Sequence, residues 1–283
     1  MKGSKEYIAG YEVLTTIGYG ARSTIYAVQD PKAGQVYALK RVLKTDPEDQ
    51  RFIDQTVTEH HVASRIDHPN IRRTHRLIRR KHLWRTTEVL LLMELVDGVS
   101  LEQQRPRTLV ETVAVFQTIA GALSELHRVG YAHADMKPSN VLLHAGDEVK
   151  IIDFGQSCRI GTVKQRIQGT PDYIAPEQVD RGPITARTDV FNLGATMYWC
   201  LTNQHVPTKI PKADGEVLLR SRKSLRAPEE LNADVPSSLN GLILDCVASR
   251  PEDRPDSMAT VAGRLDVVLH QIDRADTPTA GAY

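Results

Sequence analysis

Residues 133–140 read HADMKPSN and residues 152–155 read IDFG, and these two short segments hold the most informative polar residues of the chain. Phosphoryl transfer asks a protein mainly to position the reactants and to neutralise charge. A carboxylate must orient the attacking hydroxyl, a cation must lie near the phosphoryl that moves, and hard oxygen ligands must hold Mg²⁺. The segments supply these groups, in that order, as Asp135, Lys137, and the pair Asn140 and Asp153.

A glycine-rich segment lies upstream, where residues 18–25 read GYGARSTI between two predicted strands. Glycines let backbone N–H groups approach phosphate oxygens without a Cβ in the way. A strand follows, so this is not the dinucleotide-binding fingerprint, and Gly-Lys-Ser/Thr is missing, so it is not a Walker loop. The alternative interpretation is an ordinary hairpin turn.

Residues 37–40 read YALK, which places Lys40 at the end of an apolar strand. A lysine among apolar residues is costly unless its charge is paired. Glu59 lies on a predicted amphipathic helix over 48–66. We therefore predict that Glu59 pairs with Lys40 and holds its ammonium toward phosphate oxygens; a solvated lysine is the alternative.

Strand patterns cover 11–17, 23–28, 35–43, 71–78 and 88–95, with the helix over 48–66 among them. After Asp97-Gly98 the periodicity becomes helical, over about 108–129, 187–202, 237–249 and 257–271. This change predicts a hinge at Asp97-Gly98 between a small β lobe and a larger helical lobe.

Taken together and in this order, the motifs resemble the eukaryotic-like (Hanks-type) Ser/Thr protein kinase family over about 11–270. Further matches are APE at 175–177, TDV at 188–190 and Arg254 in PEDRP. The resemblance implies an α+β bilobal fold with a five-stranded antiparallel N-lobe carrying one helix (1–96), a mainly helical C-lobe (97–272) and a flexible tail (273–283).

The resemblance also implies roles for individual residues. Asp135, Lys137, Lys40 and Glu59 would be catalytic, and Asn140 and Asp153 would hold Mg²⁺, or Mn²⁺ in its place. ATP would be the co-substrate, with Met93 as gatekeeper and backbone hydrogen bonds from the hinge at 94–96. The ATP site would comprise Ile17, Gly18, Tyr19, Gly20, Ser23, Ile25, Ala38, Lys40, Met93, Glu94, Val96, Ser100 and Leu142.

Substrate class follows from the same resemblance. Lys137 and Thr170 match Ser/Thr rather than Tyr kinases, with Thr170 bridging Asp135 and Lys137. Glu177 and Arg254 would form a buried ion pair that braces the substrate lobe, and Asp189 would be structural. The implied function is transfer of the ATP γ-phosphoryl group to Ser or Thr hydroxyls of proteins. A pseudokinase scaffold and a small-molecule kinase are the alternatives.

Three positions depart from the family pattern. Ser23 replaces the third glycine of the loop, and Ser139 stands where some basophilic relatives carry an acidic residue. Ala134 replaces the arginine that usually pairs with a phosphorylated residue of the activation segment. We therefore expect activity that does not strictly depend on phosphorylation of that segment.

The chain has 283 residues, with 36 Lys and Arg against 35 Asp and Glu, and 41% of its residues are hydrophobic. This balance is typical of a globular protein and argues against nucleic acid as a partner. No apolar run approaches the roughly 20 residues of a membrane span, and residues 1–10 lack a signal core. The three cysteines are far apart, so reduced thiols and a cytoplasmic chain, or a cytosolic domain of a larger protein, are expected.

Basic residues gather in one segment, at Arg72, Arg73, Arg76, Arg79, Arg80, Lys81 and Arg85. Two interpretations stay open, a solvated hairpin surface and a patch for an acidic partner. The sequence does not address dimerisation.

Overall fold

The computed structural model describes residues 5–20, 22–144, 148–211, 217–219 and 225–276. The chain divides into two compact units. The N-terminal unit comprises Met1–Gly98 and Ile152–Gly155, and the C-terminal unit comprises Val99–Ile151 and Gln156–Tyr283. The prediction placed residues 97–272 in one lobe. In the structure the segment Ile152–Gly155, which contains Asp153, belongs to the N-terminal unit instead.

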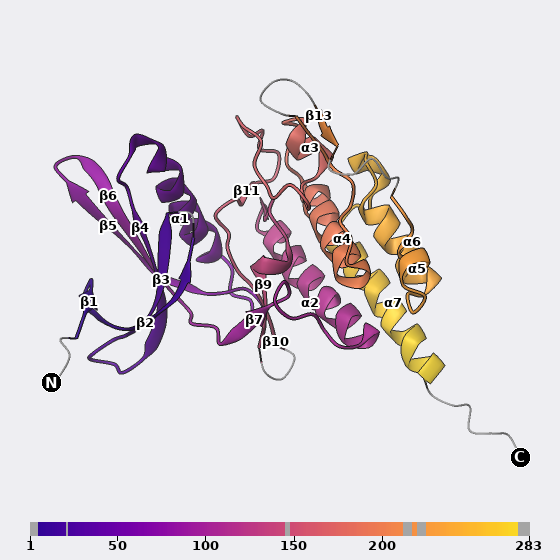
Figure 1. Cartoon of the computed structure of the whole chain (residues 1–283), viewed down its shortest axis with the longest axis horizontal. Helices are drawn as coiled ribbons and strands as arrows, with labels where there is room; N and C mark the ends of the chain where they lie inside the picture. Colours follow the sequence, from indigo (N-terminus) through magenta and orange to yellow (C-terminus); the bar gives the residue numbers. More distant parts are fainter. Residues whose placement is uncertain (1–4, 21, 145–147, 212–216, 220–224, 277–283) are drawn as a thin grey trace, which may run out of the picture. The chain divides into compact units, whose positions relative to one another are not determined.

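A six-stranded antiparallel sheet in the order β1-β2-β3-β4-β6-β5 forms the N-terminal unit (Figure 1). Its strands are β1 (Tyr7–Ile8), β2 (Tyr11–Tyr19), β3 (Ser23–Gln29), β4 (Val36–Leu43), β5 (Thr74–His82) and β6 (Arg85–Met93). The helix α1 (Gln50–Ala63), preceded by a 3₁₀ turn at Pro47–Asp49, packs against β4, β5 and β6. Ile53 and Val62 on α1 are buried, which is the amphipathic face that the sequence predicted.

The five-strand prediction missed β1. Ala9 and Gly10 both have positive φ, 53° and 91°, so they form a tight hairpin that pairs Ile8 with Tyr11. Ile8 is buried in the same apolar cluster as Val28 and Leu39. A strand of two residues is too short to show an alternating pattern, which is why the sequence did not reveal it.

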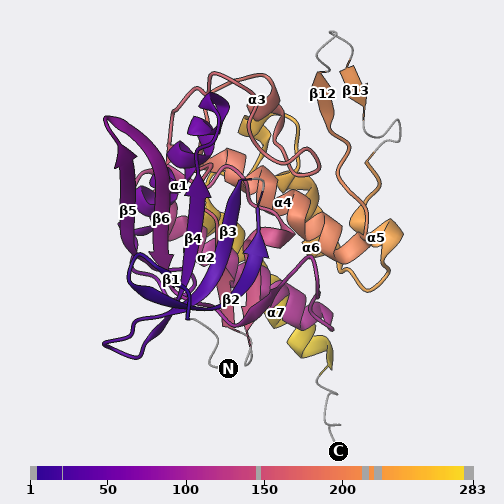
Figure 2. The same ribbon diagram turned by 60° about the vertical axis from the view of Figure 1, so that its left-hand side comes forward.

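Helices dominate the C-terminal unit. They are α2 (Leu109–Arg128), α3 (Pro176–Val179), α4 (Ala186–Thr202), α5 (Pro228–Leu231), α6 (Ser237–Cys246) and α7 (Met258–Asp276). Within this unit α2 packs against α7, and α4 packs against α6 (Figures 1 and 2). A reciprocal capping box between Thr108 and Glu111 starts α2, because each side chain accepts the other's backbone N–H.

Short strands and turns complete the C-terminal unit, whose first strand begins at the boundary residue Gly98. The strands are β7 (Gly98–Ser100), β8 (Tyr131–Ala132), β9 (Val141–His144), β10 (Glu148–Ile151), β11 (Cys158–Arg159), β12 (Lys209–Pro211) and β13 (Val217–Leu219). Two further 3₁₀ turns span Pro138–Asn140 and Pro251–Asp253. The strands pair as β10-β9-β7, β11-β8 and β12-β13.

Two predicted boundaries in the C-terminal unit were wrong. The helix predicted over 237–249 ends at Cys246. The helix predicted to end at residue 271 continues to Asp276, so residues 273–276 of the expected tail are helical. Pro278 is the first residue that forbids helix after Met258, which explains the extension. The rest of the tail lies outside the described residues.

By length and composition alone, α2 is the one described helix that could cross a membrane. Half of its most apolar stretch is buried inside the protein. The core helix of a soluble protein can have the same length and apolar composition. We therefore assign α2 to the core of the C-terminal unit.

Candidate active site

In the N-terminal unit a buried carboxylate binds two cations. Lys40 Nζ lies 2.7 Å from Glu59 Oε2, and Arg72 Nη2 lies 2.6 Å from Glu59 Oε1. Glu59 is fully buried, and Arg72 is 9% exposed. The strand β4 and the helix α1 supply the predicted pair, whereas the segment before β5 supplies the arginine.

Sequence reasoning missed the role of Arg72. Arg72 belongs to the basic cluster for which the sequence leaves a solvated hairpin surface and a patch for an acidic partner open. For this residue both interpretations are wrong, because it is buried inside the N-terminal unit before β5 begins. The sequence offers one signal, the apolar Ile71 directly before it, which is buried in the structure. An arginine next to a buried residue needs a partner for its charge.

Electrostatics favour the charged form of Lys40. Burial by itself would lower its pKa, but the carboxylates of Glu59 and Asp153 outweigh burial and the pKa is raised. Asp153 belongs to the same unit, and its Oδ1 accepts the backbone N–H of Gly155 at 3.2 Å. Lys40 therefore stays an ammonium, which the carboxylate of Glu59 binds directly and the charge of Asp153 further favours.

The glycine-rich loop is the turn between β2 and β3. Tyr19 at the end of β2 is 84% exposed, and the N–H of Gly20 donates to the carbonyl of Ser23 at 2.7 Å. Gly18 pairs with Ile25 across the two strands. Ala21 lies outside the described residues.

The same loop is tied to the start of α1, a link that the sequence did not suggest. Arg22 Nε lies 3.0 Å from Asp49 Oδ1, and Asp49 also accepts the backbone N–H groups of Thr45 and Asp46. These contacts connect the tip of the loop with the helix that carries Glu59.

The residues expected around adenine divide between the two units. Ala38 and Met93 pair across β4 and β6 and are buried in one apolar cluster, against which Ile25 packs. Ile17 is 47% exposed, Val96 is half-buried, and the N–H of Glu94 donates to the carbonyl of Arg73. Ser100 in β7 and Leu142 in β9 belong to the C-terminal unit.

Three polar side chains meet in the C-terminal unit. The hydroxyl of Thr170 donates to Asp135 Oδ1 at 2.8 Å and accepts from Lys137 Nζ at 2.8 Å. Lys137 Nζ also lies 3.2 Å from Asp135 Oδ2. Asn140 is buried, and its Nδ2 donates to the carbonyl of Asp135 at 2.8 Å, which leaves Oδ1 as the atom that can serve as a ligand.

Asp189 holds the backbone that carries Asp135. Its carboxylate accepts the backbone N–H groups of His133 and Ala134, each at 2.7 Å, and lies 2.8 Å from Nε2 of His127. Burial would raise the pKa of Asp189, but the hydrogen bonds from His127 and Ala134 lower it. These contacts hold Ala134 at φ 61°, a left-handed conformation that non-glycine residues rarely adopt.

Two contributors to this network were missed from the sequence. His127 in the last turn of α2 showed no signal beyond a polar residue on a helix. Gln178 in α3 is buried, and its Nε2 donates to the carbonyls of Ala134 (2.8 Å) and Gln168 (3.1 Å). It thereby links the segment that carries Asp135 to the segment that leads to Thr170.

Glu177 and Arg254 form a bidentate ion pair, with N–O distances of 2.8 and 2.9 Å. The Arg254 side chain is fully buried and also donates to the carbonyls of Arg187, Ala248 and Ser249. Both the charge and the donors of the guanidinium are thus satisfied.

Within the described residues no group of three or more His, Cys, Asp or Glu side chains is arranged to hold a metal ion. Mg²⁺ does not need such a cage, because it binds through one or two carboxylates together with substrate phosphates and water. The oxygen donors of Asn140 and Asp153 fit that chemistry.

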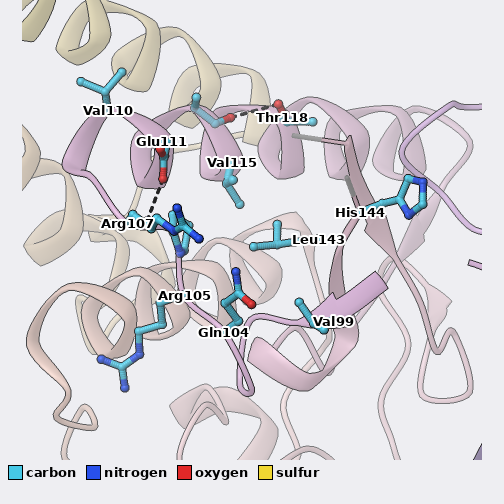
Figure 3. A pocket seen from close by; sticks show the side chains of 12 residues that line it. Val99, Gln104, Arg105, Arg107, Val110, Glu111, Val115, Thr118, Leu143 and His144 are labelled. Atoms are coloured by element: carbon cyan, nitrogen blue, oxygen red, sulfur yellow. Dashed lines mark hydrogen bonds between the residues drawn. The ribbon is translucent and has the colours of Figure 1, made fainter. Parts of the chain in front are cut away.

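A cavity of about 540 Å³ lies beside β7, β9 and the start of α2 (Figure 3). Its lining includes Val99, Gln104, Arg105, Val115, Leu143 and His144. None of the residues predicted to bind ATP lines this cavity, so it is separate from the predicted site.

The sheet unit contains the Lys40–Glu59 pair, and the helical unit contains the Asp135–Thr170–Lys137 cluster. These groups are the ones that a phosphotransferase needs. The chain belongs to the protein kinase family, since the family model of the protein kinase domain matches residues 11–264. The predicted family and α+β fold class are confirmed.

Relatives that are named as serine/threonine protein kinases support this family assignment. A probable serine/threonine-protein kinase of Clostridium acetobutylicum is 27% identical over 91% of this chain and 40% of its own length. PkaA, a serine/threonine-protein kinase of Streptomyces coelicolor, is 29% identical over 90% of this chain and 49% of its own length. The crystal structure of the PknI kinase domain of Mycobacterium tuberculosis has a TM-score of 0.69 at 26% identity, covering 94% of this chain and 98% of that one. The chain thus spans less than half the length of these curated relatives.

Proposed function

We propose that this chain is the catalytic domain of a serine/threonine protein kinase, which transfers the γ-phosphoryl group of ATP to Ser or Thr hydroxyls of proteins. The observation that carries the proposal is the contact of Thr170 with both Asp135 and Lys137, at 2.8 Å each. That contact puts a carboxylate and an ammonium within reach of one hydroxyl, which is the pairing that phosphoryl transfer needs.

Each residue has a distinct part in this proposal. Asp135 orients the attacking Ser or Thr hydroxyl, and Lys137 offsets the negative charge on the phosphoryl that moves. Lys40, held charged by Glu59, binds the phosphates of ATP. Asn140 and Asp153 would hold Mg²⁺, which when bound neutralises charge on the phosphate oxygens.

Binding of the nucleoside part is proposed from the family resemblance. Ile17, Ile25, Ala38 and Leu142 would enclose the adenine, and the backbone of residues 94–96 would hydrogen-bond its edge. The burial of Ala38 beside Met93 supports this proposal, because it fixes the strand that carries Lys40.

Replacing Asp135 with Ala tests the catalytic proposal. Loss of the orienting carboxylate should lower turnover about a hundredfold or more while ATP–Mg²⁺ binding changes little. The assay measures transfer of labelled γ-phosphate to a generic protein substrate, followed by identification of the phosphorylated amino acid. Binding is measured separately by the ATP-induced rise in melting temperature.

Asp67→Ala is the matched control, because this aspartate is 84% exposed and pairs only with the exposed Arg73 in the described structure. Full activity of Asp135→Ala would contradict the assignment. A wild-type chain that binds ATP but transfers no label would indicate a pseudokinase, and phosphotyrosine in the product would refute Ser/Thr specificity.

Independence from activation-segment phosphorylation is a further part of the proposal. Ala134 offers no cation to a phosphate, and its N–H and carbonyl are bound to Asp189 and Gln178. Instead, backbone hydrogen bonds hold the segment: the carbonyl of Thr162 accepts from Ile184, and β11 pairs with β8. Lys164 Nζ adds a bond to the carbonyl of Gln156 at 2.5 Å.

Thr162→Ala should therefore lower the rate of peptide phosphorylation by less than about tenfold, which corresponds to about 1.4 kcal/mol. Initial rates of the wild-type and variant chains provide the measurement, with and without prior phosphatase treatment. A collapse of activity in either the variant or the dephosphorylated wild type would contradict this expectation. Ser157 is left unchanged because its buried hydroxyl donates to the carbonyl of His133.

A further inference from the structure

The turn of the β5–β6 hairpin exposes two large apolar side chains. His82 pairs with Arg85, so Leu83 and Trp84 alone form the turn. Leu83 is 82% exposed and Trp84 is 95% exposed. The hairpin forms one edge of the sheet, and its turn lies at the free end of that edge (Figures 1 and 2). Single exposed apolar residues are ordinary, but two adjacent ones at a tip are not.

Local backbone preference does not account for these residues. Leu83 has φ 54°, a left-handed conformation that is rare for a bulky side chain. Two-residue hairpin turns favour Asn-Gly or similar pairs, which adopt positive φ at little cost. Leucine at residue 83 therefore disfavours folding locally, and both turn residues expose apolar surface. A backbone outlier of this kind motivates a functional explanation.

Cations flank the tip on both strands. Lys81 and Arg85 lie within two residues of it, and Arg76 and Arg79 follow along β5; all four side chains are exposed. Within the described part of the chain none of the four has a carboxylate partner. Arg80 differs, because it lies 2.9 Å from the buried Glu88. The hairpin therefore presents two apolar side chains at its turn. The two strands next to the turn carry exposed cations that have no carboxylate partner within the described residues.

We propose that this hairpin tip docks on a membrane surface that contains anionic lipids. The side chains of Leu83 and Trp84 would enter the boundary between headgroups and acyl chains, where tryptophan is favoured. Lys81 and Arg85 would then lie at the level of the lipid phosphates, where each cation strengthens binding. An apolar contact and a basic patch together provide the two signals that stable peripheral binding needs.

A single-stranded nucleic acid fits this tip less well. Such ligands bind along a basic groove with successive aromatic faces on which the bases stack. Here one aromatic ring projects from a turn beside a leucine, which has no stacking face. The membrane proposal does not depend on the proposed kinase activity, so either can fail alone.

Intrinsic fluorescence tests the docking directly, because the chain has only two tryptophans. Trp199→Phe leaves Trp84 as the sole reporter and keeps an aromatic ring beneath Arg105, whose guanidinium lies 3.9 Å from the ring of Trp199. Vesicles of phosphatidylglycerol and phosphatidylcholine should shift the emission to shorter wavelength and protect it from acrylamide, whereas phosphatidylcholine vesicles should have a much smaller effect.

Sedimentation with the same vesicles quantifies the contributions of the tip. Leu83→Gly combined with Trp84→Asn places glycine at the residue with positive φ, so melting temperature should be unchanged or higher while vesicle binding falls about tenfold or more. Lys81→Gln and Arg85→Gln should each weaken binding to the anionic vesicles about fivefold. Lys32→Gln, at an exposed turn between β3 and β4, is the matched control and should have little effect.

Unchanged binding by the variant with Leu83→Gly and Trp84→Asn would overturn the proposal, as would the absence of a fluorescence shift on anionic vesicles. Equal binding of both kinds of vesicle would refute the role of the cations. A fluorescence change with a single-stranded oligonucleotide but not with vesicles would reassign the tip to nucleic acid.

Discussion

Glu59 illustrates how much a single residue can depend on partners that are distant in sequence. Its carboxylate is fully buried, and Lys40 and Arg72 each bind one of its oxygens. Burying an ion is costly unless its charge and its hydrogen-bonding capacity are both satisfied. The second cation therefore stabilises the helix position that keeps Glu59 beside Lys40.

At this residue scale we predict a large difference between two neighbouring arginines. Arg72→Met should lower the free energy of unfolding by about 3–5 kcal/mol, because it breaks a buried ion pair. Arg73→Met should cost less than about 1 kcal/mol, because Arg73 is 59% exposed and pairs with the exposed Asp67. Denaturant unfolding of both variants measures the difference, and equal losses would show that Arg72 is not a buried structural cation.

At the scale of one element, α4 is a helix buried on nearly every side. Thr188, Phe191, Gly194 and Met197 are buried along it, and Asn203 ends it in the left-handed conformation. A Cβ added to Gly194 would lie 2.5 Å from the Cβ of Cys246 in α6. The absence of a side chain at residue 194 thus sets how closely α4 and α6 approach.

Gly194→Ala should therefore destabilise the protein by about 1–3 kcal/mol, because the two helices must separate. The control is Gly263→Ala in α7, where a Cβ would meet nothing within 4 Å. There alanine should stabilise by up to about 1 kcal/mol through its higher helix propensity. Thermal unfolding gives the sign of each effect, and a stabilising Gly194→Ala would show that the helices do not pack this closely.

At the scale of the whole molecule, Asp189 joins three parts of the C-terminal unit. It connects α4 with His127 of α2 and with the backbone that follows β8. Its pKa is lowered from the ordinary 3.8 despite burial. A group whose pKa is lower in the folded state stabilises the fold above its unfolded-state pKa, and this contribution is lost as pH falls through the folded-state value.

Asp189→Asn should lower the free energy of unfolding at neutral pH by at least about 1.5–3 kcal/mol, the value of a hydrogen bond to a charged group. Below about pH 4 the wild type should lose stability more steeply than the variant, because only the wild type takes up this proton on unfolding. Unfolding curves at stepped pH provide the measurement, with the exposed Asp266→Asn as control. Parallel pH profiles of wild type and Asp189→Asn would contradict the assignment.

The prediction of helices and strands from the sequence failed in two situations. A strand was too short to show a pattern, or a helix had no residue that marked its end. The helices α2 and α4 matched their predicted ranges to within a residue, because both have capping residues at their start. The two residues of β1 carried no pattern, and nothing before Pro278 marked the end of α7.

The amino-acid sequence alone determined the family, the α+β class and the order of the motifs, because catalytic residues recur at fixed spacings and apolar periodicity reflects local geometry. Only the tertiary structure identified the contacts of Arg72 with Glu59, of His127 with Asp189 and of Gln178 with the backbone of Ala134, and the exposed turn at Leu83 and Trp84. Burial and partnership depend on contacts between segments far apart in the chain, and no local pattern encodes which charged or apolar side chain becomes buried.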